Sequence, residues 1–198
     1  SSKTIDIEYK YPWGWGELYG LANRGDFDLT QHQEHSGEDL RYTDPDDATK
    51  KFLPYVVEPT FGLTRSVLAI LLEAYEEEKL ENDTRTVLRL DPKLAPIQVA
   101  ILPLSKKENL IGKAQEMYNK IVQETNLTVD FDVTGSIGKR YRRQDEIGTP
   151  KCITVDFGTI GEDAEQGEKD TVTVRDRDTL KQIRVPISEI ISHVSSRA

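Results

Sequence analysis

The feature that most constrains the fold is an almost unbroken apolar run at residues 98–104, QVAILPL. The run has the length of one strand and no regular polar side to turn toward water. Such a strand is typical of a position in the middle of a sheet whose two faces are both covered by other elements. The run therefore predicts a layered α/β domain built around it.

The segments that follow this run alternate between helical and strand patterns. Helices are expected at 105–123, 139–147 and 188–195. Four further strands are expected at 127–133, 152–157, 171–176 and 182–185, the last two joined as a hairpin. A strand–helix–strand–helix order that ends in consecutive strands favours a sheet with mixed strand directions. The sequence thus predicts a mixed five-stranded sheet flanked by helices.

The first part of the chain differs in charge from the second. Residues 1–83 hold 18 acidic and 8 basic side chains, whereas residues 84–198 hold 17 acidic and 18 basic ones. In the first part, Gly14–Ala22 and Tyr55–Val57 are expected to be strands, the second of them buried. Helical spacing from Val67 predicts a helix that ends near Asn82, after an acidic stretch that faces water. The break in charge predicts two units, residues 1–84 and residues 85–198.

The composition as a whole narrows the class of protein. No apolar run approaches the ~20 residues that a helix needs to span a bilayer. The single cysteine, Cys152, has no partner in the chain for a disulfide, which fits a reducing compartment. His32 and His35 have no third ligand at metal spacing, so no metal site is expected there. These features predict a cytoplasmic protein with no membrane segment.

Glu58 and Arg65 stand at the two ends of a strand-to-helix turn, in the stretch EPTFGLTR. An isolated carboxylate and guanidinium beside apolar sequence fit a structural ion pair, and they also fit half of a binding site. An arginine at a helix start can stack on a base and offer paired donors to phosphate oxygens. The residues alone leave both alternatives open.

The basic stretch at 139–143 places four cations in five residues, with Tyr141 among them. It fits a solvated helix face, and it also fits a surface that meets phosphate. Helical spacing cannot put all four cations on one face. At least one of them is therefore expected to pair internally, with Asp145 or Glu146.

Four segments, in this order, resemble the dimeric, class II type of glycyl-tRNA synthetase. They are WGWGELYGLANRGDFDLTQH, VVEPTFGLTRSVLAILLEAY, LAPIQVAILPL and GSIGKRYRRQDEIGTPKCITVDF. The resemblance runs from about Trp13 to the last expected helix. It implies that residues 1–84 are the end of a class II catalytic domain, an α+β remnant with antiparallel strands and the helix of motif 3. It implies that residues 85–198 are an α/β anticodon-binding domain.

The resemblance also implies roles for particular residues. Arg65 matches the arginine of motif 3, a catalytic residue that lies over the adenine of ATP and reaches toward its γ-phosphate. Glu17, Glu58 and Thr60 match the positions that hold glycine, although the family usually has serine where this chain has Thr60. Glu58 is also implied in ATP binding, close to where Mg²⁺ would accompany the nucleotide. Anticodon binding is implied for a further set, Arg140, Tyr141, Arg142 and Arg143.

The implied activity is ATP-dependent formation of glycyl-adenylate and transfer of the glycyl group to tRNA-Gly by a homodimeric enzyme. Motifs 1 and 2 of the class are not found in these residues, so the segment alone is not expected to form the adenylate. A non-catalytic nucleic-acid-binding protein on the same fold, like some polymerase accessory subunits, is the alternative. The presence of Glu17, Glu58 and Arg65 favours the enzyme, because a pure binding module needs no glycine pocket.

Overall fold

The structure is a computed structural model that describes residues 3–81 and 83–195. The chain divides into two compact units, Ser1–Ile70 and Leu71–Ala198. This division lies within the helix at Leu63–Ala74, before the boundary after residue 84 that the sequence predicted. The predicted boundary after residue 84 separates two functional domains rather than two compact units, and it stays a prediction.

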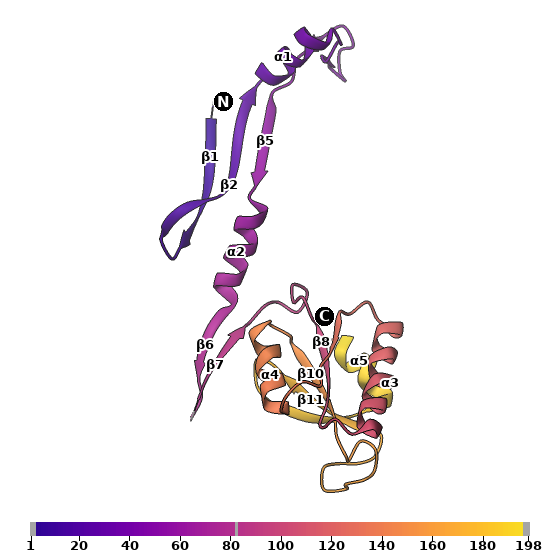
Figure 1. The fold of residues 1–198 in the computed structure, drawn as a ribbon. Helices are drawn as coiled ribbons and strands as arrows, with labels where there is room; N and C mark the ends of the chain where they lie inside the picture. Colours follow the sequence, from indigo (N-terminus) through magenta and orange to yellow (C-terminus); the bar gives the residue numbers. More distant parts are fainter. Residues whose placement is uncertain (1–2, 82, 196–198) are drawn as a thin grey trace. The chain divides into compact units, whose positions relative to one another are not determined.

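The first unit is built on a three-stranded antiparallel sheet in the order β1-β2-β5 (Figure 1). Its strands are β1 (Lys3–Tyr11), β2 (Gly14–Gly25) and β5 (Val56–Phe61). Between β2 and β5 come α1 (Phe27–Ser36) and a short pair, β3 (Tyr42–Thr43) and β4 (Lys51–Phe52). The helix α2 (Leu63–Ala74) follows β5 after a single residue. The expected strand at Gly14–Ala22 is confirmed, whereas β1 was not predicted and α1 lies in a segment, residues 24–47, whose polar composition had indicated turns.

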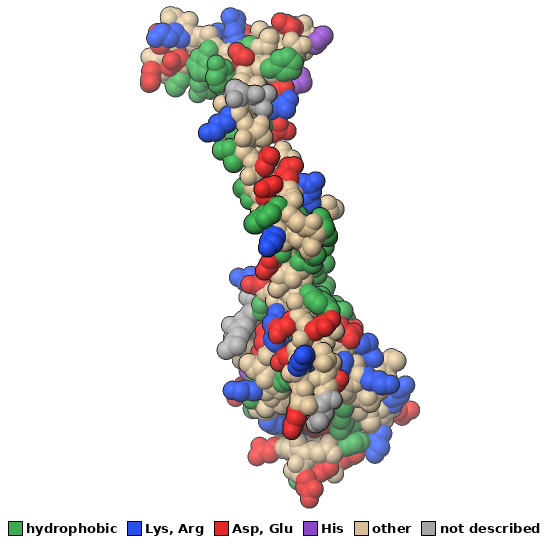
Figure 2. All heavy atoms as spheres, turned by 90° about the vertical axis from the view of Figure 1, so that its left-hand side faces the viewer, with side chains coloured by type: hydrophobic (Ala, Val, Ile, Leu, Met, Phe, Trp, Pro, Cys, Tyr) green, Lys and Arg blue, Asp and Glu red, His purple; other side chains and the backbone are tan. Residues whose placement is uncertain are grey.

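One face of this sheet is apolar and exposed. The register places Ile5 opposite Leu21, and Ile7 and Phe61 on either side of Tyr19. Hydrophobic side chains therefore stand at the surface of this unit (Figure 2). The prediction of a buried strand near residue 56 is wrong, because no element among the described residues of this unit covers that face.

The second unit contains the predicted mixed sheet, in the order β12-β11-β10-β8-β9. Its strands are β8 (Val99–Pro103), β9 (Val129–Phe131), β10 (Lys151–Val155), β11 (Thr171–Asp176) and β12 (Gln182–Pro186). The three strands β9, β8 and β10 are parallel, β11 pairs antiparallel with β10, and β12 pairs antiparallel with β11. The helices are α3 (Glu108–Glu124), α4 (Ile137–Glu146) and α5 (Ile190–Ser195), the last one preceded by a 3₁₀ turn, Ile187–Glu189.

Both faces of the middle strands are covered, as the apolar run predicted. On one side Ile101 and Ile153 pack with Leu110 of α3 and Ile190 of α5, all fully buried. On the other side Leu102 and its neighbours pack against α4. The helices α3 and α5 therefore lie on the opposite side of the sheet from α4 (Figure 1).

The prediction of a helix that continues to Asn82 is wrong. The helix α2 ends at Ala74, and the acidic stretch after it is strand β6 (Tyr75–Lys79), paired with β7 (Thr84–Leu88). Glutamates and lysine favour helix when nothing else decides. Here the ladder with β7 and ion pairs to Arg85 and Arg89 outweigh that preference, so the acidic residues do not simply face water.

Gly148, just after α4, lies against the hairpin β6–β7. Its φ is +82°, and a Cβ atom on it would lie 2.9 Å from the Leu88 carbonyl oxygen. Gly148→Ala is expected to lower the free energy of unfolding by about 1–3 kcal/mol, because it adds both a clash and backbone strain. Urea denaturation of the chain measures this.

Gly112 is the matched control, because it lies within α3 and a Cβ atom on it would meet nothing within 4 Å. Gly112→Ala is expected to raise stability by about 0.5–1 kcal/mol through helix propensity. Equal effects of the two substitutions would contradict the close contact at Gly148.

Candidate functional site

A β-bulge in β2 decides which way Glu17 points. The pairing of β1 with β2 shifts by one residue between Ile7 and Glu8, so Leu18 is an extra residue on β2. In a regular strand Glu17 and Gly20 would face opposite sides, because they are three residues apart. The bulge reverses that alternation. The Glu17 Oε1 atom lies 3.4 Å from the position that a Cβ atom on Gly20 would occupy.

Strand β5 brings Thr60 and Glu58 to the same face of the sheet. Thr60 pairs with Gly20, and its Cβ lies 3.9 Å from the Cβ position at that glycine. Glu58 is two residues earlier on the strand, where its Oε2 is 3.3 Å from Nη1 of Arg24. Thr60 is thus a close neighbour of the Glu17 carboxylate, and Glu58 lies further along the face, engaged by a cation.

Arg65, in the first turn of α2, reaches back to the bulge. Its Nη1 donates a hydrogen bond of 2.7 Å to the Glu17 carbonyl oxygen and lies 3.6 Å from Glu17 Oε2. Gly62 allows this close approach, because a Cβ atom on it would lie 2.8 Å from the Leu18 carbonyl oxygen. The Arg65 side chain is still 53% exposed, so part of its guanidinium is open to a ligand. The structure brings Glu17, Thr60 and Arg65 together from three elements.

In the second unit, Arg140 and Arg143 fasten α4 to the strand ends beside it. Arg140 is 2% exposed and donates to the carbonyl oxygens of Pro103 at 2.6 Å and Asp132 at 3.1 Å. Arg143 donates through Nε to the Asp132 carboxylate at 3.2 Å. Burial raises the pKa of Asp132, but hydrogen bonds from Arg143 and the Thr134 backbone outweigh it and hold that pKa below its ordinary value.

Arg142 points to a different neighbour, and its Nη2 donates to Asp83 at 2.6 Å. The expectation that the basic stretch pairs internally is confirmed by the pairs with Asp83 and Asp132. The expected partners, Asp145 and Glu146, are wrong for these pairs. Asp145 is bound by arginines from outside the stretch.

The helix α4 covers only part of its side of the sheet. The Tyr141 hydroxyl lies 2.6 Å from Thr154 Oγ1, and the Arg175 guanidinium carbon lies 4.8 Å from the centre of the Tyr141 ring. Burial raises the pKa of Tyr141, so its hydroxyl keeps its proton at neutral pH.

Beside Tyr141 opens a hollow of about 310 Å³, lined by Leu104, Ile137, Asp156, Gln166, Thr173 and Gln182. Amide, hydroxyl and carboxylate groups beside an aromatic ring are the groups that read the edges and faces of unpaired bases. The hollow and α4 together form a candidate nucleic-acid interface.

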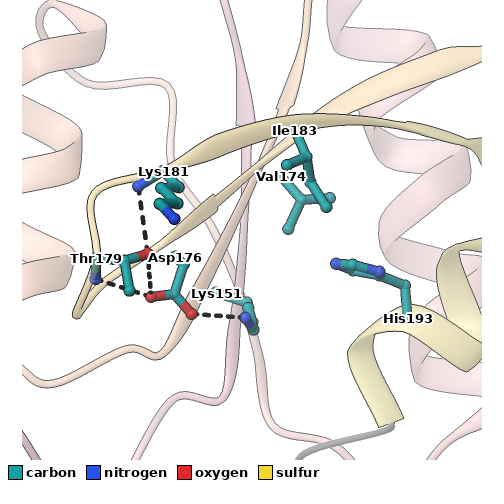
Figure 3. Close-up of a pocket in the computed structure, with 7 residues that line it drawn as sticks. All are labelled: Lys151, Val174, Asp176, Thr179, Lys181, Ile183 and His193. Carbon is teal, nitrogen blue, oxygen red and sulfur yellow. Dashed lines mark hydrogen bonds and ion pairs between the residues drawn. The ribbon is translucent and has the colours of Figure 1, made fainter.

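A second hollow, of about 380 Å³, lies on the other side of the same sheet, beside α5 (Figure 3). Val174 and Ile183 form an apolar wall, and the His193 ring points toward it from α5 (Figure 3). The Lys151 ammonium on its rim donates to Asp176 at 2.7 Å. Asp176 neutralises Lys151, whereas Lys181, another lining residue, adds a second cation to this hollow.

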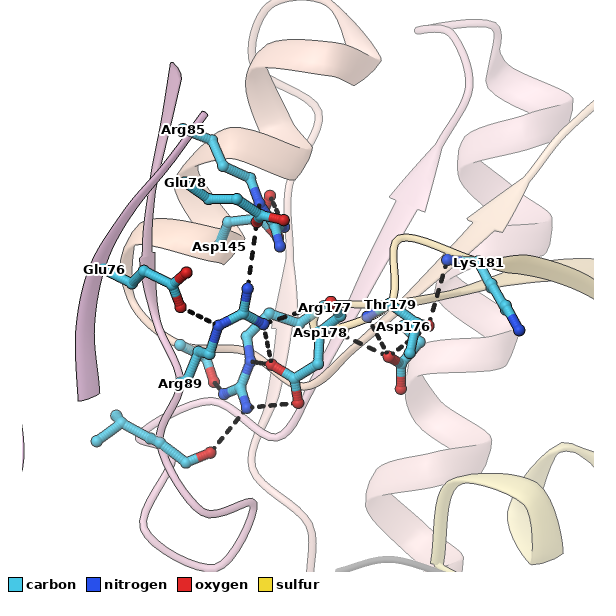
Figure 4. Close-up of polar contacts among 12 residues, drawn as sticks. Glu76, Glu78, Arg85, Arg89, Asp145, Asp176, Arg177, Asp178, Thr179 and Lys181 are labelled. Carbon is cyan, nitrogen blue, oxygen red and sulfur yellow. Dashed lines mark hydrogen bonds and ion pairs between the residues drawn. The ribbon is translucent and has the colours of Figure 1, made fainter. Parts of the chain in front are cut away.

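A buried ion-pair network joins α4 to the hairpin β6–β7 (Figure 4). The Asp145 carboxylate is fully buried, with Nη1 of Arg85 at 3.0 Å and Nη1 of Arg175 at 2.8 Å. Arg85 also pairs with Glu78 on β6. A buried carboxylate is very costly without partners, and here two guanidinium groups supply them. The network fixes α4 between β7 and β11.

Asp145→Asn is expected to lower the free energy of unfolding by about 3–5 kcal/mol, because it leaves two buried guanidinium groups without their shared counter-charge. Chemical denaturation of the chain measures the change. Glu146→Gln, at the exposed neighbouring position, is the control and is expected to change stability by less than about 0.5 kcal/mol. An unchanged denaturation midpoint for the Asp145 variant would count against the network.

The polar residues of the open sheet face were not predicted from the sequence. The alternation in CITVD and TVTVRD, with Thr154 and Thr173 between apolar residues, was the available signal of one polar face. The bulge at Leu18 had no comparable signal, because it exists only through the pairing of β2 with β1.

Residues 98–197 match the family model described as anticodon binding domain. The chain therefore belongs to the anticodon-binding domain family. It is also similar to glycine–tRNA ligases over nearly all of its length. The relative from Bacillus cereus is 56% identical over 190 residues, which are 96% of this chain and 39% of the relative.

Two clostridial relatives of the same name align with a slightly larger share of this chain. The glycine–tRNA ligase of Clostridium beijerinckii is 54% identical over 99% of this chain and 40% of its own length. That of Clostridium acetobutylicum is 52% identical over 100% of this chain and 40% of its own length. The chain thus spans about 40% of the length of the curated relatives it matches. Across residues 3–81 and 83–195, no helix has the length and apolar character needed to cross a membrane.

Proposed function

We propose that this chain is part of a glycine–tRNA ligase, with amino-acid and nucleotide contacts in residues 1–84 and tRNA contacts in residues 85–198. In this reaction a glycine carboxylate oxygen attacks the α-phosphorus of ATP, which gives glycyl-adenylate and releases pyrophosphate. A ribose hydroxyl at the end of tRNA-Gly then attacks the glycyl carbonyl and releases AMP. The protein would act as a homodimer in the cytoplasm.

The observation that most directly supports this proposal is the contact of Arg65 with Glu17, two residues 48 positions apart in the chain. Arg65 would lie over the adenine of ATP and reach its γ-phosphate, because a guanidinium both stacks on a ring and binds phosphate in pairs of hydrogen bonds. The Glu17 carboxylate and the Thr60 hydroxyl would receive the glycine ammonium, with Glu58 further along the same face. Such contacts act by positioning and by electrostatics rather than through a nucleophile of the protein.

Mg²⁺ would enter with the ATP phosphates. Among the described residues, no group of three or more His, Cys, Asp or Glu side chains is arranged to hold a metal ion. Near the triphosphate this chain would contribute the Glu58 carboxylate, and the phosphates would provide further charged ligands. Magnesium would supply charge neutralisation on the triphosphate.

The complete protein that carries this chain provides the test, through glycine-dependent exchange of pyrophosphate into ATP. Arg65→Lys keeps the charge but loses the planar donor pair, and it is expected to lower kcat/KM for ATP by about 10²–10³-fold. Arg41→Gln is the control, because Arg41 is exposed and pairs locally with Asp39; it is expected to leave the rate within about twofold. Absence of glycine-dependent exchange by the unsubstituted protein would contradict the proposed function.

For tRNA, we propose that unpaired anticodon bases occupy the hollow beside Tyr141 while Arg142 and Arg143 meet phosphates. Arg140, which is 2% exposed, would act by holding α4 in place. The Arg142 side chain is one-third exposed and pairs with the exposed Asp83, so a phosphate can replace that partner. In this arrangement Arg142 and Arg143 of the basic stretch contact RNA, and Arg140 supports the helix that carries them.

Arg142→Gln is expected to weaken tRNA binding by the complete protein about 3- to 10-fold and to reduce the slope of log affinity against log salt by about one. Lys120→Gln is the matched control, because Lys120 lies on α3, across the sheet, and pairs with Glu124. Fluorescence anisotropy over ~50–200 mM salt measures both. A salt slope that Arg142→Gln leaves unchanged would exclude a phosphate contact at this position.

A further inference from the structure

Gly20 lies at the centre of a row of residues that crosses the three strands of the first unit. The register places Asp6 of β1 and Thr60 of β5 directly opposite Gly20 on its two sides. Residues paired in antiparallel strands share a face, so the side chains of this row stand together. The bulge at Leu18 adds Glu17 to the same group.

The space above Gly20 is bounded by polar side chains. A Cβ atom at Gly20 would lie 3.4 Å from Glu17 Oε1 and 3.9 Å from both Asp6 Oδ1 and the Thr60 Cβ. These are ordinary contact distances, and the φ of Gly20 is not in the left-handed region. The fold therefore does not require glycine here. Its effect is to leave open a small space that any side chain would fill.

The charges around this space are unbalanced. Arg65 lies 3.6 Å from Glu17, and Arg24 is shared between Asp28 and Glu58. Among the described residues no ion pair or hydrogen bond is recorded for the Asp6 carboxylate. Two carboxylates next to each other repel, and a cation seated between them removes that cost and gains charge-assisted hydrogen bonds.

We infer that Asp6 is a third acceptor for the α-ammonium group of the amino-acid substrate, which sits above Gly20 between Asp6, Glu17 and Thr60. The inference rests on the proposed function and goes beyond it by adding Asp6 and Gly20 to the residues that bind glycine. An ammonium group has three N–H donors, and the Asp6 carboxylate, the Glu17 carboxylate and the Thr60 hydroxyl offer one acceptor for each. Further along the face, Glu58 lies 3.3 Å from Arg24, which also pairs with Asp28.

The test is glycine-dependent pyrophosphate exchange by the complete protein with Asp6→Asn. The substitution keeps the shape of the side chain and removes its charge. It is expected to raise KM for glycine about 10- to 100-fold, which is the range for one charge-assisted hydrogen bond. The KM for ATP is expected to stay within about twofold, because the proposed nucleotide contacts, Arg65 and Glu58, do not include Asp6.

Glu38→Gln is the control for net charge, because Glu38 is an exposed acid outside the sheet, and it is expected to change neither KM. Gly20→Ala is the second variant, since its added methyl group fits the fold but occupies the ammonium space; it is expected to raise KM for glycine at least tenfold without lowering the melting temperature.

The possible failures are distinguishable. If the unsubstituted protein exchanges with glycine but Asp6→Asn leaves KM for glycine unchanged, the inference about Asp6 is overturned and the proposed function stands. Equal rises in KM for glycine and ATP would also overturn it, because they indicate a structural role. If the unsubstituted protein shows no exchange with glycine, the proposed function fails and the inference fails with it.

Discussion

The buried Asp145 carboxylate is the interaction on which the second unit depends. It lies on α4, and its two arginine partners come from β7 and from β11. A carboxylate that is fully buried needs both partners, and the partners need it, so three elements distant in sequence are held in one arrangement. The position of α4 follows from this, and so do the extent of sheet that α4 covers and the hollow that it leaves open beside Tyr141.

The first unit depends on a backbone feature instead of a buried charge. The extra residue at Leu18 turns Glu17 onto the face that carries Thr60, and Gly62 lets the start of α2 approach the same point. Arg65 then closes the arrangement through its bond to the Glu17 carbonyl. A regular β2 would place the Glu17 carboxylate on the apolar face, where it could not meet Thr60.

The two units differ in how their charges are used. In the second unit most arginines bind carboxylates or carbonyl oxygens of the chain itself, as Arg140 and Arg175 do, and they act by fixing elements in place. In the first unit Glu17 and Arg65 are each about half exposed, at 49% and 53%, and so retain the capacity to bind charged groups of a ligand. Exposure, more than charge count, therefore separates the candidate ligand-binding residues from the structural ones.

The sequence by itself determined the mixed sheet of the second unit and the positions of most of its strands, because strand and helix periods are local properties of the backbone. It also marked Glu17, Thr60 and Arg65 as candidates through their resemblance to a known family. Only the tertiary structure decided the secondary structure of residues 75–79, which form a strand although their residue types favour helix. It likewise decided that Asp145 binds Arg85 and Arg175 and that Glu17 faces Thr60. These outcomes depend on which distant segments pair, and pairing across tens of residues leaves no periodic mark in the chain.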